Sequence, residues 1–210
     1  MGRGEIDIPD WLAISMTNIL PKNTDTHLAK NYRPIACQNI TYKLYTGILN
    51  EFLYDHCATN SIIALEQAGG KKGLWGCTDQ LLINKMILDE VRSNQQNLFM
   101  MWFDYQKAFD SIPLWLLEAL KLAKIPIMLQ NAISNLTEKW ATNVYLRTNE
   151  NISVTDTIRY LTGVLQGDWL SLLLFILCVN PLSFLLDKTC NGYLAGSIGE
   201  RITNKPLFIC

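Results

Sequence analysis

The strongest constraint on the fold of this chain is the apolar stretch at residues 170–186, which must be shielded from water wherever it lies. We predict that it forms one long helix. The 18 residues 169–186 approach the roughly 20 that cross a bilayer, so a membrane span is an alternative. Two serines and a break at Asn180 and Pro181 weaken a lone span, whereas a protein core tolerates them. We therefore expect a core helix and no membrane partner.

The rest of the chain divides into predicted strands, helices and one glycine-rich loop. Extended or alternating apolar runs predict strands at residues 14–20, 32–37, 143–147 and 152–158. The first two are expected at sheet edges because of their prolines, and the last two as a hairpin. Apolar residues at helical spacing predict helices at residues 42–53, 81–91, 113–122 and 128–140. Residues 65–78, rich in glycine, predict a loop that closely approaches another group.

Composition and charge narrow the possible functions. With 210 residues, of which 49% are hydrophobic, the chain can bury a sizeable core in one or two globular domains. Its net charge of −1 lacks the positive charge of a free-standing nucleic-acid binder, so any nucleic-acid site must be a local groove. Six cysteines without a C-x-x-C pair, and no apolar signal segment at the start, predict reduced thiols in the cytoplasm or nucleus.

A first candidate site follows the apolar run at residues 98–103, which predicts a buried strand. The run ends at Asp104, and a second carboxylate, Asp110, follows six positions later. Carboxylate oxygens are the ligands that Mg²⁺ prefers, and a strand end holds such a ligand rigidly. Taken alone, an aspartate in this position is more often a helix cap or a turn residue.

A second candidate site is the glycine-rich turn GVLQGDWLS at residues 163–171, which enters the long apolar helix. Backbone N–H groups at such a helix start can face phosphates, Gly167 permits close approach, and Gln166 can hydrogen-bond a nucleotide. The alternative is a plain turn followed by an aspartate that caps the helix.

A third candidate is Arg33, which lies in the extended segment NYRPI at residues 31–35. Its planar guanidinium can clamp a triphosphate. The alternative is that Arg33 is solvated or paired with a carboxylate.

In their order and separation these motifs resemble the reverse transcriptase family of non-LTR retrotransposons, over residues 14–208. The fingers motifs of that family are matched at residues 20–22 (LPK), 31–35 and 42–44 (YKL). Residues 66–67, 73, 76–77 and 79–85 (DQLLINK) look like the segment before the palm. Residues 104–110 resemble the first catalytic motif of the palm, and residues 163–175 resemble the GxxQGDxLSPLLF motif.

The resemblance implies an α+β fold of the right-hand polymerase type. Helix-rich fingers are expected at residues 1–97, and an antiparallel palm sheet backed by helices at residues 98–210. Both would belong to one reverse transcriptase domain.

For the chemistry, the resemblance implies that Asp104 is catalytic and binds both Mg²⁺ ions. The reaction would be two-metal phosphoryl transfer, in which one ion activates the primer 3′-hydroxyl and the other steadies the leaving pyrophosphate. An RNA template, a DNA primer and dNTPs would be its substrates. Lys71 and Lys72 would touch template phosphates, with a solvated loop as the alternative.

The resemblance also implies how this chain would hold the incoming nucleotide. Arg33 would contact the triphosphate, and the backbone around Tyr105 would help to hold it. The ring of Phe109 would lie under the sugar, exclude a 2′-hydroxyl and so favour dNTPs. Gln166 and Gly167 would support the nucleotide and the template.

The chain departs from the family pattern in three places. The paired aspartates expected shortly after the GxxQGD helix are absent, Leu172 replaces a proline, and Thr162 stands where relatives often carry a basic residue. We therefore expect a truncated domain, with an incomplete palm sheet and no thumb, that is inactive alone and belongs to a longer parent polyprotein. The alternative is a non-catalytic retroelement remnant that binds RNA or a partner.

Overall fold

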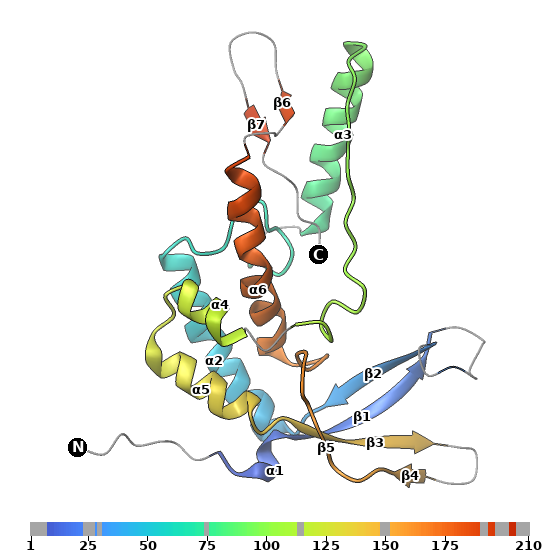
Figure 1. Ribbon diagram of the computed structural model, residues 1–210, viewed down its shortest axis with the longest axis vertical. Helices are drawn as coiled ribbons and strands as arrows, with labels where there is room; N and C mark the ends of the chain where they lie inside the picture. The colour runs from blue at the N-terminus through green and yellow to red at the C-terminus, as the bar shows by residue number, and fades with distance from the viewer. Residues whose placement is uncertain are drawn as a thin grey trace. The chain divides into compact units, whose positions relative to one another are not determined.

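A computed structural model describes residues 8–22, 28, 31–73, 76–112, 116–147, 152–189, 193–195 and 202–204 (Figure 1). The chain forms two compact units. The first combines Met1–Asn60 with Lys107–Phe175, and the second combines Ser61–Gln106 with Ile176–Cys210. Helices and strands both contribute, so the expected mixture of the two is confirmed.

The first unit contains a five-stranded mixed sheet. Its strands are β1 (Ile14–Pro21), β2 (Tyr32–Cys37), β3 (Ala141–Arg147), β4 (Ile152–Val154) and β5 (Ile158–Arg159). Figure 1 shows the order β2-β1-β3-β4, and β5 also pairs with β3. β1 runs antiparallel to β2 but parallel to β3. The sheet is therefore mixed: β3, β4 and β5, which lie within residues 98–210, pair antiparallel, and the parallel pair is made with β1 from residues 1–97.

The expectation of two edge strands is correct for β2 and wrong for β1. β2 lies at the sheet edge, where the missing N–H of Pro34 is tolerated. β1 lies between β2 and β3 because its only proline, Pro21, is its last residue and leaves the other N–H groups for pairing. The hairpin is confirmed, since β3 pairs antiparallel with both β4 and β5, while its turn at 148–151 lies outside the described residues.

The buried side chains at the start of β1 are polar, and their hydroxyl groups form hydrogen bonds with β3. Ser15 and Thr17 are buried, whereas Met16 between them is 47% exposed, as expected for alternating side chains. The Thr17 and Thr142 hydroxyls lie 2.7 Å apart, and the Ser15 hydroxyl donates to the Ala141 carbonyl. These hydrogen bonds offset the cost of burying hydroxyl groups and fix the parallel register of β1 and β3.

Four helices complete the part of the first unit that the structure describes, together with the start of a fifth. They are α1 (Asp10–Ala13), α2 (Ile40–Thr59), α4 (Leu116–Leu122) and α5 (Ile127–Thr137). Asn39 caps the start of α2, because its side chain accepts a hydrogen bond from the Tyr42 N–H. Its buried residues recur every three or four positions, the spacing of one helix face. The predicted α2 is thus confirmed and extends further at both ends.

The other two predicted helices of this unit are confirmed over their described residues. α5 ends at Thr137, not at Trp140, and a turn leads from there into β3. α4 is described from Leu116, so the expected helix start at Pro113 lies outside the described residues. Leu120 of α4 and Ile133 of α5 are fully buried, and each such side chain contributes about 1.5–3 kcal/mol to stability.

The long apolar helix is confirmed as α6 (Trp169–Asp187), within one residue of the prediction at each end. It contributes Trp169–Phe175 to the first unit and the rest to the second. By length and composition alone it could cross a membrane, but 56% of that window is buried within the structure, as in the core helix of a soluble protein. The helix continues through Pro181.

The second unit contains α3 (Cys77–Ser93), the second part of α6 and the hairpin of β6 (Tyr193–Ala195) and β7 (Ile202–Asn204). Asn180 of α6 holds the segment just before the predicted loop, because its side chain accepts from the Ala64 N–H at 2.9 Å and donates to the Ile62 carbonyl at 2.8 Å. The predicted loop lacks helix and strand at its described residues 65–73 and 76, and α3 then begins four residues earlier than expected. Its close approach to another group stays a prediction.

The predicted buried strand at residues 98–103 is wrong. These residues are extended, but the structure assigns them no strand, and Phe99 and Phe103 are 97% and 82% exposed. An apolar run becomes a buried strand only where a neighbouring strand supplies hydrogen bonds and a second layer covers it. In the part of the chain that is described, no strand pairs with this run.

Candidate functional site

The glycine-rich turn at residues 163–168 is hydrogen-bonded to the end of the first candidate motif and to the residues just after it. The Gly163 N–H donates to the Ile112 carbonyl and the Val164 N–H to the Phe109 carbonyl, both at 2.9 Å. A Cβ atom on Gly163 would lie 2.9 Å from the Asp110 Cα and from the Phe109 carbonyl oxygen, and Gly163 has φ +84°. Only glycine fits both the space and this backbone conformation.

The same turn also contacts β2, the strand that carries Arg33. The Ala36 N–H donates to the Gln166 carbonyl at 3.2 Å. A Cβ atom on Gly167, which has φ +104°, would lie 3.1 Å from the Ala36 carbonyl oxygen. The turn is therefore held between β2 and residues 107–112, and we call this three-segment contact the turn junction.

Two side chains join the motifs directly at the turn junction. The Gln166 amide donates to the Asp110 carboxylate, with 3.0 Å between Nε2 and Oδ1. The Phe109 ring stacks on Phe175 of α6, with 5.5 Å between centroids and 17° between planes. A partly buried, hydrogen-bonded amide and a stacked aromatic ring thus belong to the same junction.

The structure brings together only some of the predicted site residues. Phe109, Gln166 and Gly167 meet at the turn junction, and Arg33 is exposed on β2, three residues before Ala36. The others lie in the second unit: Asp104 and Tyr105 are exposed on the extended segment, and Lys71 and Lys72 lie on the loop.

Lys71 is tied to its own loop. Its Nζ donates to the Ala64 carbonyl at 2.8 Å, and burial lowers the pKa of its ammonium group while Glu66 opposes that shift. Lys71 is therefore not fully solvated, and a template role for it stays a prediction.

The described residues contain no group of three or more His, Cys, Asp or Glu side chains that could hold a metal ion. The donor chemistry nevertheless suits Mg²⁺, since Asp104 offers exposed carboxylate oxygens. Asp110 is less available, because one of its oxygens accepts from Gln166.

Sequence reasoning missed the partners of Asp168. The residue is buried and caps α6, as in the structural alternative for this motif, with the Trp169 and Leu170 N–H groups donating to its carboxylate. Thr46 and Tyr42 of α2 bind it as well. Burial raises the pKa of the Asp168 carboxyl group, and these hydrogen bonds partly offset the shift. The only sequence signal was a tyrosine and a threonine on the otherwise apolar face of α2.

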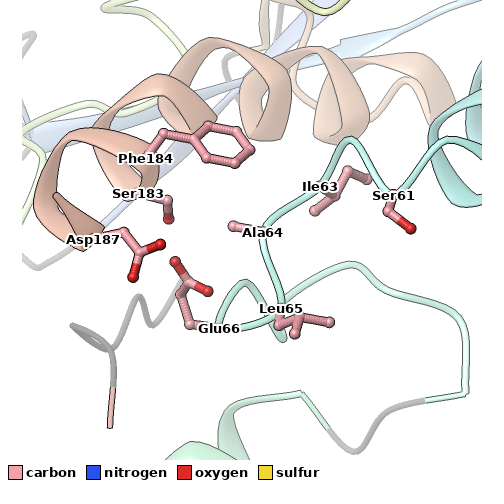
Figure 2. Close-up of a pocket in the computed structure, with 8 residues that line it drawn as sticks. All are labelled: Ser61, Ile63, Ala64, Leu65, Glu66, Ser183, Phe184 and Asp187. Atoms are coloured by element: carbon pink, nitrogen blue, oxygen red, sulfur yellow. The ribbon is translucent and has the colours of Figure 1, made fainter. Parts of the chain in front are cut away.

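The second unit has a small pocket between its loop and α6. Figure 2 shows Glu66 of the loop and Asp187 of α6 on the same side of it, with Phe184 further along the helix. Its volume of about 280 Å³ is at the lower limit of ligand pockets. None of the predicted site residues lines it.

The family of the chain follows from a comparison with known proteins. Residues 20–200 match the family described as reverse transcriptase (RNA-dependent DNA polymerase), so the chain belongs to that family.

Two relatives indicate which type of reverse transcriptase the chain resembles. One is a retrovirus-related Pol polyprotein from the type-1 retrotransposable element R2 of Nasonia vitripennis, 27% identical over 188 residues. The other is the R2 Pol polyprotein of Popillia japonica, 28% identical over 204 residues. They cover 87% and 95% of this chain, which spans only 17% and 26% of their lengths. The chain is thus a reverse transcriptase domain of the non-LTR retrotransposon type.

Proposed function

We propose that this chain is the fingers and palm region of an enzyme that copies RNA into DNA, with residues 1–97 as fingers and 98–210 as palm. The observation that carries the proposal is the turn junction. It joins three segments singled out by sequence, namely β2, residues 107–112 and the turn at 163–168, through four contacts between backbone or side-chain groups.

The turn junction supplies the groups that a nucleotide site needs. Arg33 is exposed and offers positive charge for a triphosphate. Gly167, which has no side chain, lets a nucleotide or template base approach the backbone. Asp110 accepts one N–H of the Gln166 amide, which orients that side chain and leaves its oxygen free to accept from a ligand.

Phe109 is the proposed wall under the sugar. Stacking on Phe175 restrains its ring, so that the ring cannot move aside at low cost. A fixed wall excludes a 2′-hydroxyl by steric repulsion, which favours dNTPs over NTPs.

Asp104 is the proposed metal ligand and catalytic residue, and the backbone near Tyr105 is proposed to help hold the triphosphate. When bound, Mg²⁺ would supply charge stabilisation and activation of the primer 3′-hydroxyl. The exposed Asp104 carboxylate is free of burial costs that would oppose metal binding. Asp110 is proposed to orient Gln166 instead.

We further propose that an RNA template and a DNA primer are the partners, and that Lys71 and Lys72 lie near template phosphates. The net charge of −1 leaves little general attraction for nucleic acid, so contact must be local. Cys37, Cys57 and Cys178 are free thiols, which suits an intracellular site of action.

Equilibrium binding of dNTPs to the chain on a primed RNA template tests the proposal. The template-matched dNTP should bind more tightly than a mismatched one, only with Mg²⁺, and Asp104→Asn should remove the Mg²⁺ dependence. An unchanged Mg²⁺ dependence in Asp104→Asn would refute the metal role of Asp104. RNA binding without any dNTP binding would favour a non-catalytic RNA-binding role.

A further inference from the structure

A carboxylate with no role in the proposed chemistry is buried behind the turn junction. Asp168 is 7% exposed and accepts hydrogen bonds from four donors. The Thr46 hydroxyl lies 2.7 Å from Oδ1, and the Tyr42 hydroxyl makes a longer contact of 3.5 Å with Oδ2. The Trp169 and Leu170 N–H groups are the other two donors. All of these partners are neutral.

The direction of the hydrogen bonds to Asp168 is fixed by Trp140. The Trp140 indole N–H donates to the Tyr42 hydroxyl at 2.9 Å. An indole nitrogen can only donate, so the Tyr42 oxygen accepts this bond and its own proton remains for Asp168. Tyr42 and Thr46 are fully buried, and Trp140 is nearly so. The Tyr42 hydroxyl therefore has one arrangement that satisfies both of its neighbours, while the Thr46 hydroxyl lies nearer to Asp168, at 2.7 Å, than to the Lys43 carbonyl, at 3.4 Å.

This network links three elements that all contact or flank the turn junction. Tyr42 and Thr46 lie one helical turn apart on α2, Trp140 directly precedes β3, and Asp168 ends the glycine-rich turn. The other contacts of the turn are the backbone bonds to residues 107–112 and to Ala36 of β2, and the side-chain bond from Gln166 to Asp110. Asp168 is thus the contact that fixes the end of the turn to α2.

Capping α6 does not explain these partners. A cap needs only the first N–H groups of the helix and is satisfied at the protein surface. Burial of a carboxylate is costly unless each of its acceptor positions is used. A threonine and an oriented tyrosine on α2 meet that need, and they also tie the turn to a rigid helix.

We propose that Asp168 is a positioning residue, which holds Gln166 and Gly167 against β2 and residues 107–112 through its bonds to Thr46 and Tyr42. The inference rests on the proposed function, because it assigns the held turn to the nucleotide site. It predicts that loss of the Thr46 hydroxyl loosens the turn junction without unfolding the sheet.

Two substitutions of Thr46 in the 210-residue chain distinguish loosening of the turn junction from unfolding of the sheet. Thr46→Val keeps the shape of the side chain but removes its donor, whereas Thr46→Ser keeps the donor. Amide hydrogen exchange at Ala36, Gly163 and Val164 reports the turn junction. Thr46→Val should lower protection there roughly tenfold, as expected for one hydrogen bond to a charged group, and Thr46→Ser should restore it. Amides of the β1–β3 ladder should keep their protection.

The outcomes that overturn the proposal are distinct. Unchanged exchange at the turn junction in Thr46→Val would show that Asp168 does not hold the turn. An equal loss at the turn junction and in the β1–β3 ladder would show a general structural role. Tyr42→Phe provides a second variant that keeps the buried ring, and it should loosen the same three amides by a smaller factor because its contact is longer.

Nucleotide binding gives the second readout and separates failure of the inference from failure of the proposed function. Thr46→Val should weaken dNTP affinity several-fold, and Thr46→Ser should match the unsubstituted chain. Loosened amides with unchanged affinity would overturn the link between Asp168 and the nucleotide. If the unsubstituted chain binds no dNTP, the proposed function fails and with it this link, while the exchange pattern still decides whether Asp168 holds the turn.

Discussion

Gln166 donates a hydrogen bond to Asp110, with 3.0 Å between Nε2 and Oδ1, although 56 positions separate the two residues in the chain. The bond joins two motifs that sequence alone singled out separately. It also gives each residue a defined task, because Asp110 orients an amide whose oxygen remains available to a ligand.

Gln166→Glu tests this pairing. The substitution keeps the size of the side chain but places a carboxylate against Asp110, and the two like charges repel. We expect Gln166→Glu to weaken dNTP affinity more than Gln166→Ala, which only removes the amide. Titration of a template-matched dNTP onto each variant bound to primed RNA measures the difference, and equal affinities would contradict the pairing.

Gly163→Ala tests the close backbone approach at the turn junction. The new Cβ atom would lie 2.9 Å from backbone atoms of Asp110 and Phe109, at φ +84°. We expect a loss of about 1–3 kcal/mol in the free energy of unfolding, measured with urea. Gly47→Ala is the matched control: its Cβ would meet nothing within 4 Å inside α2, and we expect a gain of about 0.5–1 kcal/mol.

Phe109→Ala tests the proposed wall under the sugar. Loss of the ring that stacks on Phe175 opens space for a 2′-hydroxyl. We expect the preference for dNTP over the matching NTP to fall roughly tenfold or more. Phe52→Ala serves as control, because Phe52 is 61% exposed on α2. A preference that stays unchanged in Phe109→Ala would remove this residue from the nucleotide site.

Asp168 makes stability depend on pH in a defined direction. Burial raises the pKa of its carboxyl group in the folded protein above the usual value of 3.8. The carboxyl group therefore takes up its proton at a higher pH in the folded state than in the unfolded state. As pH falls through the raised pKa towards 3.8, the wild-type protein should gain stability relative to Asp168→Asn. Urea unfolding of both proteins at a series of pH values measures this difference. The opposite trend would mean that the four hydrogen bonds outweigh burial.

The cysteines should differ widely in reactivity towards alkylating reagents. Burial raises the pKa of the Cys57 thiol to about 11 and that of Cys178 to about 12, whereas Cys37 is exposed on β2. Since the thiolate is the reactive form, Cys37 should be labelled before Cys57 and Cys178, which should react only on unfolding. Mass spectrometry of labelled peptides measures the order. Rapid labelling of Cys57 in the folded chain would contradict its burial.

The elements that sequence predicted well depend on local patterns. α2 and α6 follow from apolar residues at helical spacing, and β2 follows from an extended run whose proline suits an edge. The run at 98–103 has an equally strong pattern, but strand formation depends on a partner elsewhere in the chain. A pattern of this kind cannot show whether that partner is in place.

The sequence predicted which motifs form the candidate site, but it did not predict the contacts between them. Sequence singled out Phe109, Gln166 and Gly167, and the structure brings them together. The bond between Gln166 and Asp110 depends on a turn with positive φ at two glycines, which no spacing rule provides. The helix cap at Asp168 was among the alternatives, but its bonds to Thr46 and Tyr42 require α2 to lie beside the turn.

Photo-cross-linking with an azido-dATP tests the central claim most directly, namely that the turn junction holds the incoming nucleotide. The chain would be irradiated on a primed RNA template with Mg²⁺, and the modified peptides mapped with and without excess dATP. We predict cross-links within residues 33–37, 105–110 and 163–168 that excess dATP removes. Cross-links elsewhere, for example along the pocket at residues 61–66, or cross-links that dATP does not compete, would contradict the assignment.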